Sequence, residues 1–299
     1  TPLKSGNLVD GEKIRDLVEG FYQAAGVDKK AVDTGAVIIT GETSRKENAR
    51  TVLNTLSDFA GEFVVATAGP DLESILAARG AGAVEHSRGK RVLHMDIGGG
   101  TSNLALIRDG IVVRTGCLNV GGRLIKFDEN CRTTYVSPVL IELCKLRPGD
   151  TATKPLLEEA AEKLVQALEM AAGLREKTAL LEKLWTAETA GCAMSRRAEG
   201  ISFSGGVADC ICRDIPWQEF GDMGPILGRA IRNSRLCGGC YRLGEETIRA
   251  TVIGAGCHSA QLSGSTVFYQ NIEFPLKNLP VARSFPQEEP AVLALEGME

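Results

Sequence analysis

The first ninety residues alternate between helical and strand patterns. Apolar residues recur at three- and four-residue spacing through residues 12–25, which is typical of an amphipathic helix: Ile14, Leu17, Val18, Phe21 and Tyr22. Short apolar runs at 37–39 and 63–66 predict strands buried on both faces, and each is followed by a predicted helix, at about 46–59 and 71–79. Strands that alternate with helices predict parallel βαβ units.

The pattern changes after residue 90. Three predicted strands at 91–97, 103–107 and 111–116 are separated by a glycine-rich turn and by Asp109-Gly110, which favours a hairpin. Three antiparallel strands in succession predict the start of a new lobe. The later elements are helices at 154–172, 174–187 and 225–232, a strand at 201–203, and a small-residue helix through 254–256 to about 262. Residues 126–136 form a polar, hairpin-like insertion, and the prolines after residue 274 predict a linker.

The composition fits a two-lobed globular protein. A chain of 299 residues with 43% hydrophobic content can bury one large core or two ordinary ones. The net charge of −4, with both signs interspersed, argues against a nucleic-acid surface or an anchor on an anionic membrane. No run approaches the roughly 18 to 20 apolar residues that span a bilayer, so we expect a cytosolic protein. Because the chain begins at Thr1 without Met and ends soon after a proline-rich run, we also expect a fragment.

The nine cysteines predict reduced thiols, because their number is odd and their spacing is irregular. Only Cys237 and Cys240 have the spacing of metal ligands. With three histidines in the chain and no second Cys-x-x-Cys pair, a tetrahedral zinc site lacks ligands.

The most informative segment is Met-Asp-Ile-Gly-Gly-Gly-Thr-Ser-Asn at residues 95–103, between two strands of the predicted hairpin. Three consecutive glycines let the backbone turn tightly and leave its amides free to face an anion, as phosphate-binding loops do. Asp96 is well placed to hold a magnesium ion through water, and Thr101 and Ser102 offer hydroxyls to phosphate or metal. The alternative is a flexible hairpin turn with an aspartate cap.

This segment resembles the second phosphate loop of the actin, sugar-kinase and Hsp70 superfamily, where Asp-(Leu or Ile)-Gly-Gly-Gly-Thr is a signature. Residues 203–208 (Phe-Ser-Gly-Gly-Val-Ala) are similar to the adenosine loop of that superfamily, with a plain left-handed turn as the alternative. Two small-residue segments, 69–83 and 252–260, resemble its hinge-lining connecting helices, or else reflect generic tight packing. The four segments occur in the order of the superfamily, which favours this fold.

Within the superfamily the resemblance is narrower. Five runs are similar to the reactivating factor of ethanolamine ammonia-lyase: 37–43, 63–83, 118–124, 250–266 and 274–282. The resemblance implies an α/β protein with the actin-like ATPase fold, in which two ribonuclease H-like lobes have mixed sheets flanked by helices. The first lobe is expected to be incomplete at its N-terminus. The implied domains are 1–90 for the remainder of the first lobe, 91–270 for the second lobe with both loops, and 271–299 for a linker.

The resemblance implies a chaperone that uses ATP and magnesium to loosen ethanolamine ammonia-lyase, an adenosylcobalamin enzyme, so that damaged cobalamin exchanges for intact coenzyme. The lyase is then the direct partner and cobalamin only an indirect one, in the cytoplasm or in association with a bacterial microcompartment. Members of the family carry another phosphate hairpin, Asp-x-Gly-Thr-Thr, which this sequence lacks. We therefore expect ATPase activity of the full-length protein and negligible turnover by residues 1–299 alone.

The implied roles fall on the quoted segments. Asp96 positions magnesium and orients water, and Glu73 contributes to metal or water positioning, or else is a solvated acid at a helix N-terminus. The residues expected to bind the phosphates and the adenosine are Gly98, Gly99, Gly100, Thr101, Ser102, Ser204, Gly205 and Gly206.

Three other interpretations stay open. Reactivases of diol or glycerol dehydratase perform the same task on a different lyase. Cys237 and Cys240 invite comparison with the iron-sulfur activator of 2-hydroxyacyl-CoA dehydratases, an actin-like ATPase, and the absorption spectrum of anaerobically purified protein would distinguish it. A filament-forming scaffold of the cell-division type is the non-enzymatic alternative, which nucleotide-dependent sedimentation would reveal.

Overall fold

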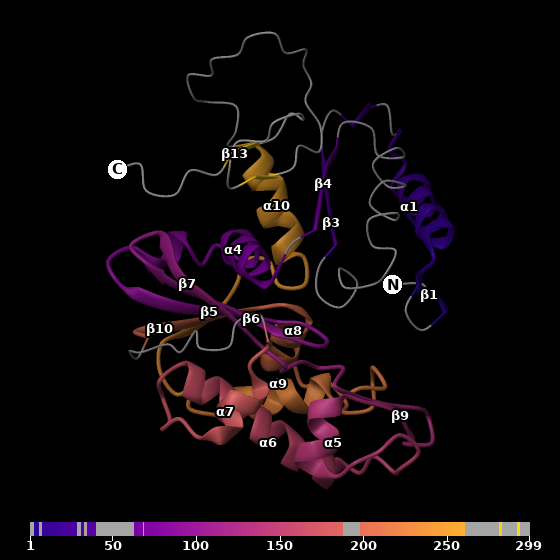
Figure 1. The fold of residues 1–299 in the computed structure, drawn as a ribbon, viewed down its shortest axis with the longest axis vertical. Helices are drawn as coiled ribbons and strands as arrows, with labels where there is room; N and C mark the ends of the chain where they lie inside the picture. The colour runs from indigo at the N-terminus through magenta and orange to yellow at the C-terminus, as the bar shows by residue number, and fades with distance from the viewer. Residues whose placement is uncertain are drawn as a thin grey trace. The chain divides into compact units, whose positions relative to one another are not determined.

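The computed structural model describes residues 3–5, 8–28, 31–32, 35–39, 63–67, 69–187, 198–260, 281–282 and 292–293. The chain forms two compact units. One consists of Thr1–Ile39, Lys46–Thr67 and Ser259–Glu299, and the other of Thr40–Arg45 and Ala68–His258. The second unit contains most of the described residues and every predicted site residue (Figure 1).

In the first unit, α1 (Gly11–Ala25) forms where the apolar stripe predicts a helix. Asp10 caps its N-terminus by accepting a hydrogen bond from the backbone amide three residues ahead, at 3.2 Å. Gly26 ends the helix with φ 65°, a left-handed conformation that glycine adopts without strain.

The strands of the first unit form short pairs. They are β1 (Leu3–Ser5) with β2 (Leu8–Val9), β3 (Gly35–Ile39) with β4 (Phe63–Thr67), and β12 (Val281–Ala282) with β13 (Val292–Leu293). β3 and β4 are parallel, which confirms the predicted orientation of these two strands. The helix predicted between them, at 46–59, lies outside the described residues.

The second unit is built on a five-stranded mixed sheet with the order β11-β10-β5-β6-β7. Its strands are β5 (Arg91–Ile97), β6 (Ser102–Arg108), β7 (Ile111–Leu118), β10 (Gly200–Ser204) and β11 (Tyr241–Leu243). The antiparallel run β5-β6-β7 is confirmed, and β10 lies parallel to β5 and to β11. The sequence pattern does not predict β11, a short edge strand that is mostly exposed.

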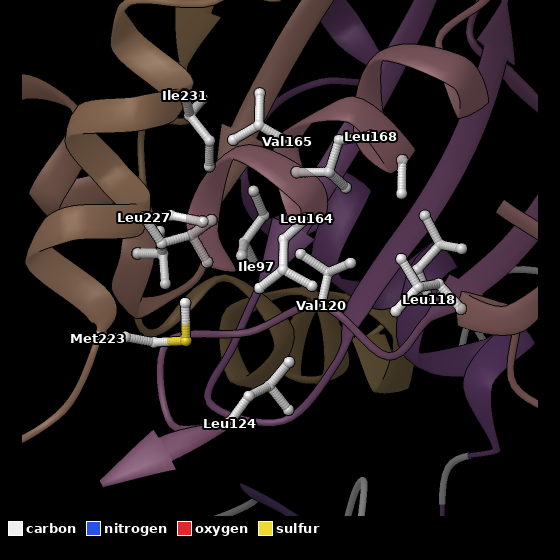
Figure 2. Packing of buried hydrophobic residues seen from close by; sticks show 14 of the residues in the cluster. Ile97, Leu118, Val120, Leu124, Leu164, Val165, Leu168, Met223, Leu227 and Ile231 are labelled. Atoms are coloured by element: carbon white, nitrogen blue, oxygen red, sulfur yellow. The ribbon is translucent and has the colours of Figure 1, made fainter. Parts of the chain in front are cut away.

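One face of this sheet carries the main core. Its helices are α5 (Pro138–Cys144), α6 (Lys154–Ala171), α7 (Ala179–Leu184), α8 (Gly206–Cys212) and α9 (Gly224–Arg232). Figure 2 shows Ile97 of β5 among the side chains of Leu164 on α6 and Leu227 on α9, and all three are at most 2% exposed. Because side chains alternate along a strand, burial of these apolar residues against α5–α9 places His94 and Asp96 on the opposite face of β5.

The predicted helices differ from the observed ones at particular residues. The helix expected at 174–187 is only α7, because Thr178 caps the helix by accepting from the amide of Leu180. The helices α5 and α8 have seven residues each and are too short to show a period in the sequence. None of the helices in the described ranges is long and apolar enough to cross a bilayer.

The insertion at 126–136 is a β-hairpin, as its pattern predicts. β8 (Ile125–Phe127) pairs in antiparallel orientation with β9 (Thr133–Val136). A short 3₁₀ helix, η2 (Glu85–Ser87), precedes β5.

The other face of the sheet is covered by α4 (Pro70–Gly80), whose Ala78 packs against Ala105 and Ile107 of β6. α4 crosses α10 (Ala250–Ala260) at two glycines. A Cβ on Gly80 would lie 1.8 Å from the carbonyl oxygen of Ala250, so the backbones of the two helices are in direct contact. Both contacts lie within the second unit, which includes Ala68–His258.

Candidate functional site

Residues 98–101, the predicted phosphate loop, connect β5 to β6. The Gly98 amide donates to the Thr101 carbonyl oxygen at 2.9 Å, which closes a tight turn. The amides of Gly99 and Gly100 do not donate in this turn, and they do not donate to the segment that follows β7. A Cβ on Gly100 would meet no atom within 4 Å, so space is open beside the loop. This geometry fits a loop whose amides face an anion.

The glycines and the arginine that follow β7 hold this loop in place. The Gly98 and Gly99 carbonyl oxygens accept from the amides of Gly122 at 3.0 Å and Arg123 at 2.6 Å. A Cβ on Gly121 would lie 2.3 Å from the Gly99 carbonyl oxygen, so only glycine fits there. These contacts direct two loop carbonyls toward the protein.

The predicted adenosine loop lies beside the phosphate loop. β10 runs parallel to β5, and the register pairs Ser204 with Asp96, so the two loops follow the ends of neighbouring strands. Gly205 has φ 84°, and a Cβ there would lie 2.3 Å from the carbonyl oxygen of Ile97. Glycine is therefore required both for the backbone conformation and for the contact with β5. The structure brings together two loops that the sequence separates by about a hundred residues, as a single nucleotide site requires.

Asp96 is buried at the base of the phosphate loop, with 8% of its surface exposed. The Ser204 hydroxyl donates to its Oδ1 at 2.5 Å. Burial raises the pKa of Asp96 from 3.8 to about 6, and the hydrogen bond from Ser204 opposes this shift. At neutral pH the carboxylate is ionised but poorly solvated, a state that a cation would stabilise. Carboxylates in such surroundings are concentrated at functional sites.

Asn103 is a candidate site residue that the sequence interpretation leaves out. It lies directly opposite Asp96 in the antiparallel register, on the same face of the sheet, and is 2% exposed. Its Oδ1 is buried and has no hydrogen-bond partner among the described residues. A buried amide oxygen without a partner normally costs 1–3 kcal/mol, so it favours a ligand at this position. Register-counting across the predicted hairpin would have found it.

Asp96 and Asn103 fit a magnesium ion. Carboxylate and amide oxygens are hard ligands, and magnesium in nucleotide sites usually takes one or two protein oxygens together with phosphates and water. Within the described ranges no three His, Cys, Asp or Glu side chains cluster as metal ligands. The described residues therefore do not form a metal site in which protein side chains supply every ligand.

The remaining predicted residues differ in their surroundings. Ser102 is buried and donates its hydroxyl proton to the Val120 carbonyl oxygen at 2.7 Å, which leaves half-buried Thr101 as the more accessible hydroxyl. Glu73 lies in the first turn of α4. The hydroxyl of the neighbouring Ser74 contacts β7, and β7 is two strands away from β5, which carries Asp96. A role of Glu73 toward a cation at Asp96 therefore stays a prediction.

Arg123 and Asp222 form a second charged pair beside the loop, which the sequence does not reveal. Arg123 packs against Gly99, and its Nε lies 3.5 Å from Asp222 Oδ2. Asp222 also accepts from the Gly224 amide at 2.8 Å, at the start of α9. Burial raises the pKa of Asp222, while the amide and the guanidinium oppose that shift. The exposed arginine places a positive charge next to the predicted phosphate loop.

Cys237 and Cys240 lie in the segment between α9 and β11. Cys237 is half-buried, Cys240 is exposed, and both are free thiols. Burial raises the pKa of Cys237 to about 11.

The mixed sheet and its covering helices have the actin-like ATPase fold. A Ppx/GppA family protein from Aquifex aeolicus superposes with a TM-score of 0.51 at 14% identity, over 88% of this chain and 86% of that one. The family model described as ethanolamine utilisation protein EutA matches residues 1–297. The chain therefore belongs to the EutA family.

Two relatives carry the name ethanolamine ammonia-lyase reactivase EutA. The protein of Salmonella typhimurium is 39% identical over 306 residues, covering 97% of this chain. That of Escherichia coli is 39% identical over 301 residues, covering 94% of this chain. The match spans 63% and 62% of the length of these two relatives.

Proposed function

We propose that the full-length protein is an ATP-dependent reactivating chaperone of ethanolamine ammonia-lyase, and that the unit around β5 and β10 supplies half of its ATP site. The observation that carries this proposal is the placement of Gly205 on the backbone of Ile97, which joins the adenosine loop to the phosphate loop next to buried Asp96. The identity of 39% to two relatives named as reactivases of this lyase supports the choice of partner.

In this proposal each part of the site has one task. The amides of the loop 98–101 bind the terminal phosphates, with the exposed Arg123 adding positive charge. Asp96 and Asn103 hold magnesium, which neutralises phosphate charge when bound. The backbone at 205–206 accommodates the adenosine, because a side chain at Gly205 would collide with β5.

The chaperone action follows from differential binding. A nucleotide shifts a conformational equilibrium only if it binds the alternative states with different affinity. We propose that ATP binding and hydrolysis change the arrangement of the full-length protein, and that this change loosens the lyase so that damaged cobalamin leaves and intact coenzyme enters. Cobalamin is then bound by the lyase and not by this protein, and the exchange takes place in the cytoplasm or in a bacterial microcompartment.

The test uses full-length protein, ethanolamine ammonia-lyase inactivated with hydroxocobalamin, adenosylcobalamin and magnesium ATP. We expect wild-type protein to restore lyase activity and Asp96→Ala to abolish the restoration while the variant stays folded. Asp214→Ala is the matched control, because Asp214 is an exposed aspartate paired with Arg232. Undiminished restoration by Asp96→Ala would refute the site. Restoration of diol dehydratase but not of ethanolamine ammonia-lyase would refute the partner.

A further inference from the structure

A chain of hydrogen bonds runs from Ser202 through His94 and Ser204 to Asp96. His94 Nδ1 lies 3.1 Å from Ser202 Oγ, and His94 Nε2 lies 3.0 Å from Ser204 Oγ. Ser204 Oγ then donates to Asp96 Oδ1 at 2.5 Å. The four side chains share one face of the sheet, because the parallel register pairs Ser202 with His94 and Ser204 with Asp96. Figure 1 shows β5 and β10, the two strands that carry them.

The chain is sealed from solvent. His94 and Ser204 have no exposed surface, and Ser202 is 4% exposed. A fully buried imidazole whose two nitrogens face serine hydroxyls is held in its neutral form. A neutral imidazole has one donor and one acceptor nitrogen, and both face a serine here.

The direction of the chain follows from its protons. Each serine hydroxyl has one proton to donate. Because Ser204 donates its proton to the ionised Asp96, it can only accept a hydrogen bond from His94, whose ring proton must therefore be on Nε2. Nδ1 is then the acceptor for the hydroxyl of Ser202. The opposite tautomer would take the Ser204 proton and leave Asp96 Oδ1 without this donor.

We propose that His94 is a positioning residue for the cation site. By donating a hydrogen bond to Ser204, it directs the Ser204 proton toward Asp96 Oδ1 and leaves Asp96 Oδ2 for the magnesium ion. This inference rests on the proposed function, since it concerns the ligand role of Asp96. Outer-shell hydrogen bonds of this kind orient a metal ligand, and their loss typically weakens metal binding by 10–100-fold. Ser204 also directly precedes Gly205, so the same bonds connect the adenosine loop to the cation ligand.

Two amide substitutions separate the donor role from packing. The amide nitrogen of glutamine is as many bonds from Cβ as imidazole Nε2, and that of asparagine as many as Nδ1. His94→Gln therefore retains a donor toward Ser204, whereas His94→Asn retains one only toward Ser202. We expect His94→Asn to weaken the binding of Mn²⁺ by full-length protein with ATP about tenfold, measured by electron paramagnetic resonance, and His94→Gln to stay close to wild type.

A double-mutant cycle and a spectrum complete the test. In a Ser204→Ala background, His94→Asn should have no further effect on Mn²⁺ affinity, because the connection to Asp96 is already broken. Nitrogen-15 spectra of labelled histidine should show His94 as a neutral ring protonated on Nε2, with the resonance assigned by its loss in His94→Gln.

Three results would overturn the inference. The first is a wild-type affinity for Mn²⁺ in His94→Asn. The second is an equal loss of Mn²⁺ affinity in His94→Gln and His94→Asn, together with an equal fall in unfolding temperature. The third is a His94 ring protonated on Nδ1. Asp96→Ala distinguishes this failure from that of the proposed function. If Asp96→Ala weakens Mn²⁺ binding and His94→Asn does not, only the positioning role is refuted; if Asp96→Ala also binds Mn²⁺ normally, the proposed cation site is refuted.

Discussion

Gly254 of α10 lies against Leu76 of α4, so close that a Cβ on the glycine would be 1.9 Å from the Leu76 carbonyl oxygen. With the matching contact at Gly80, the two helices cross backbone to backbone. A crossing without interposed side chains permits the helices to slide over each other by small shear movements. The crossing also leaves no room for an added Cβ atom, so a substitution at either glycine tests whether the two helices are packed in this way.

Gly80→Ala should destabilise the protein although alanine is the better helix former. The helix propensity favours alanine by about 1 kcal/mol, but the collision with the Ala250 carbonyl oxygen forces the helices apart. We expect a net loss of about 3 kcal/mol in the free energy of unfolding, measured by chemical denaturation. Gly20→Ala in α1 is the control, since a Cβ there meets nothing within 4 Å, and it should be neutral or stabilising. A rise in stability with Gly80→Ala would contradict the crossing.

Gly100→Ala tests the phosphate loop without disturbing the fold. Its Cβ would meet no protein atom within 4 Å, so the unfolding temperature should not change. A methyl group beside the loop amides should nevertheless obstruct a phosphate and weaken ATP binding by full-length protein about tenfold, or about 1.4 kcal/mol, in a calorimetric titration. Gly205→Ala should lower both stability and ATP affinity, because its Cβ would collide with Ile97. Wild-type ATP affinity of Gly100→Ala would show that the phosphates bind elsewhere.

The ionisation of Asp96 predicts opposite pH dependences for stability and for cation binding. The pKa is about 6 in the folded protein and 3.8 ordinarily, so the folded state binds the proton more tightly. The contribution of Asp96 to the free energy of unfolding should therefore fall as pH rises between these two values, by about 3 kcal/mol, and stay level above them. Affinity for Mn²⁺ should rise over the same interval, since only the carboxylate binds a cation. Asp96→Asn should remove both dependences, and a binding curve flat through that interval would contradict the assignment.

Glu169 is a buried carboxylate whose loss should be costly. It is 3% exposed near the end of α6, where Oε2 accepts from Arg175 Nε at 2.8 Å and Oε1 from the Arg235 amide at 3.0 Å. Glu169→Ala leaves these donors without an acceptor, so we expect a loss of about 2 kcal/mol in thermal unfolding. Glu159→Ala on the same helix should change nothing measurable, because the Glu159–Lys163 pair is exposed. Equal effects of the two substitutions would contradict this role.

Local sequence patterns account for much of the second unit. The apolar runs and the Asp109-Gly110 turn predict the antiparallel run β5-β6-β7, because strand alternation and turn chemistry act over a few residues. The same locality explains the failures. Both α8 and β11 are short and take their conformation from packing, and the helix predicted at 174–187 begins only after its cap at Thr178.

The sequence by itself determined the loop chemistry: three glycines after Asp96 between two strands, and a second glycine pair after Ser204. Only the tertiary structure decided that β10 lies next to β5, which puts Ser204 on Asp96 across a separation of 108 residues and places His94 between two serines. It also left Asn103 Oδ1, opposite Asp96, without a hydrogen-bond partner in the part of the chain that the structure describes. The reason is that the register of distant strands is set by which side chains the helices bury, a property of the whole core that no short segment encodes.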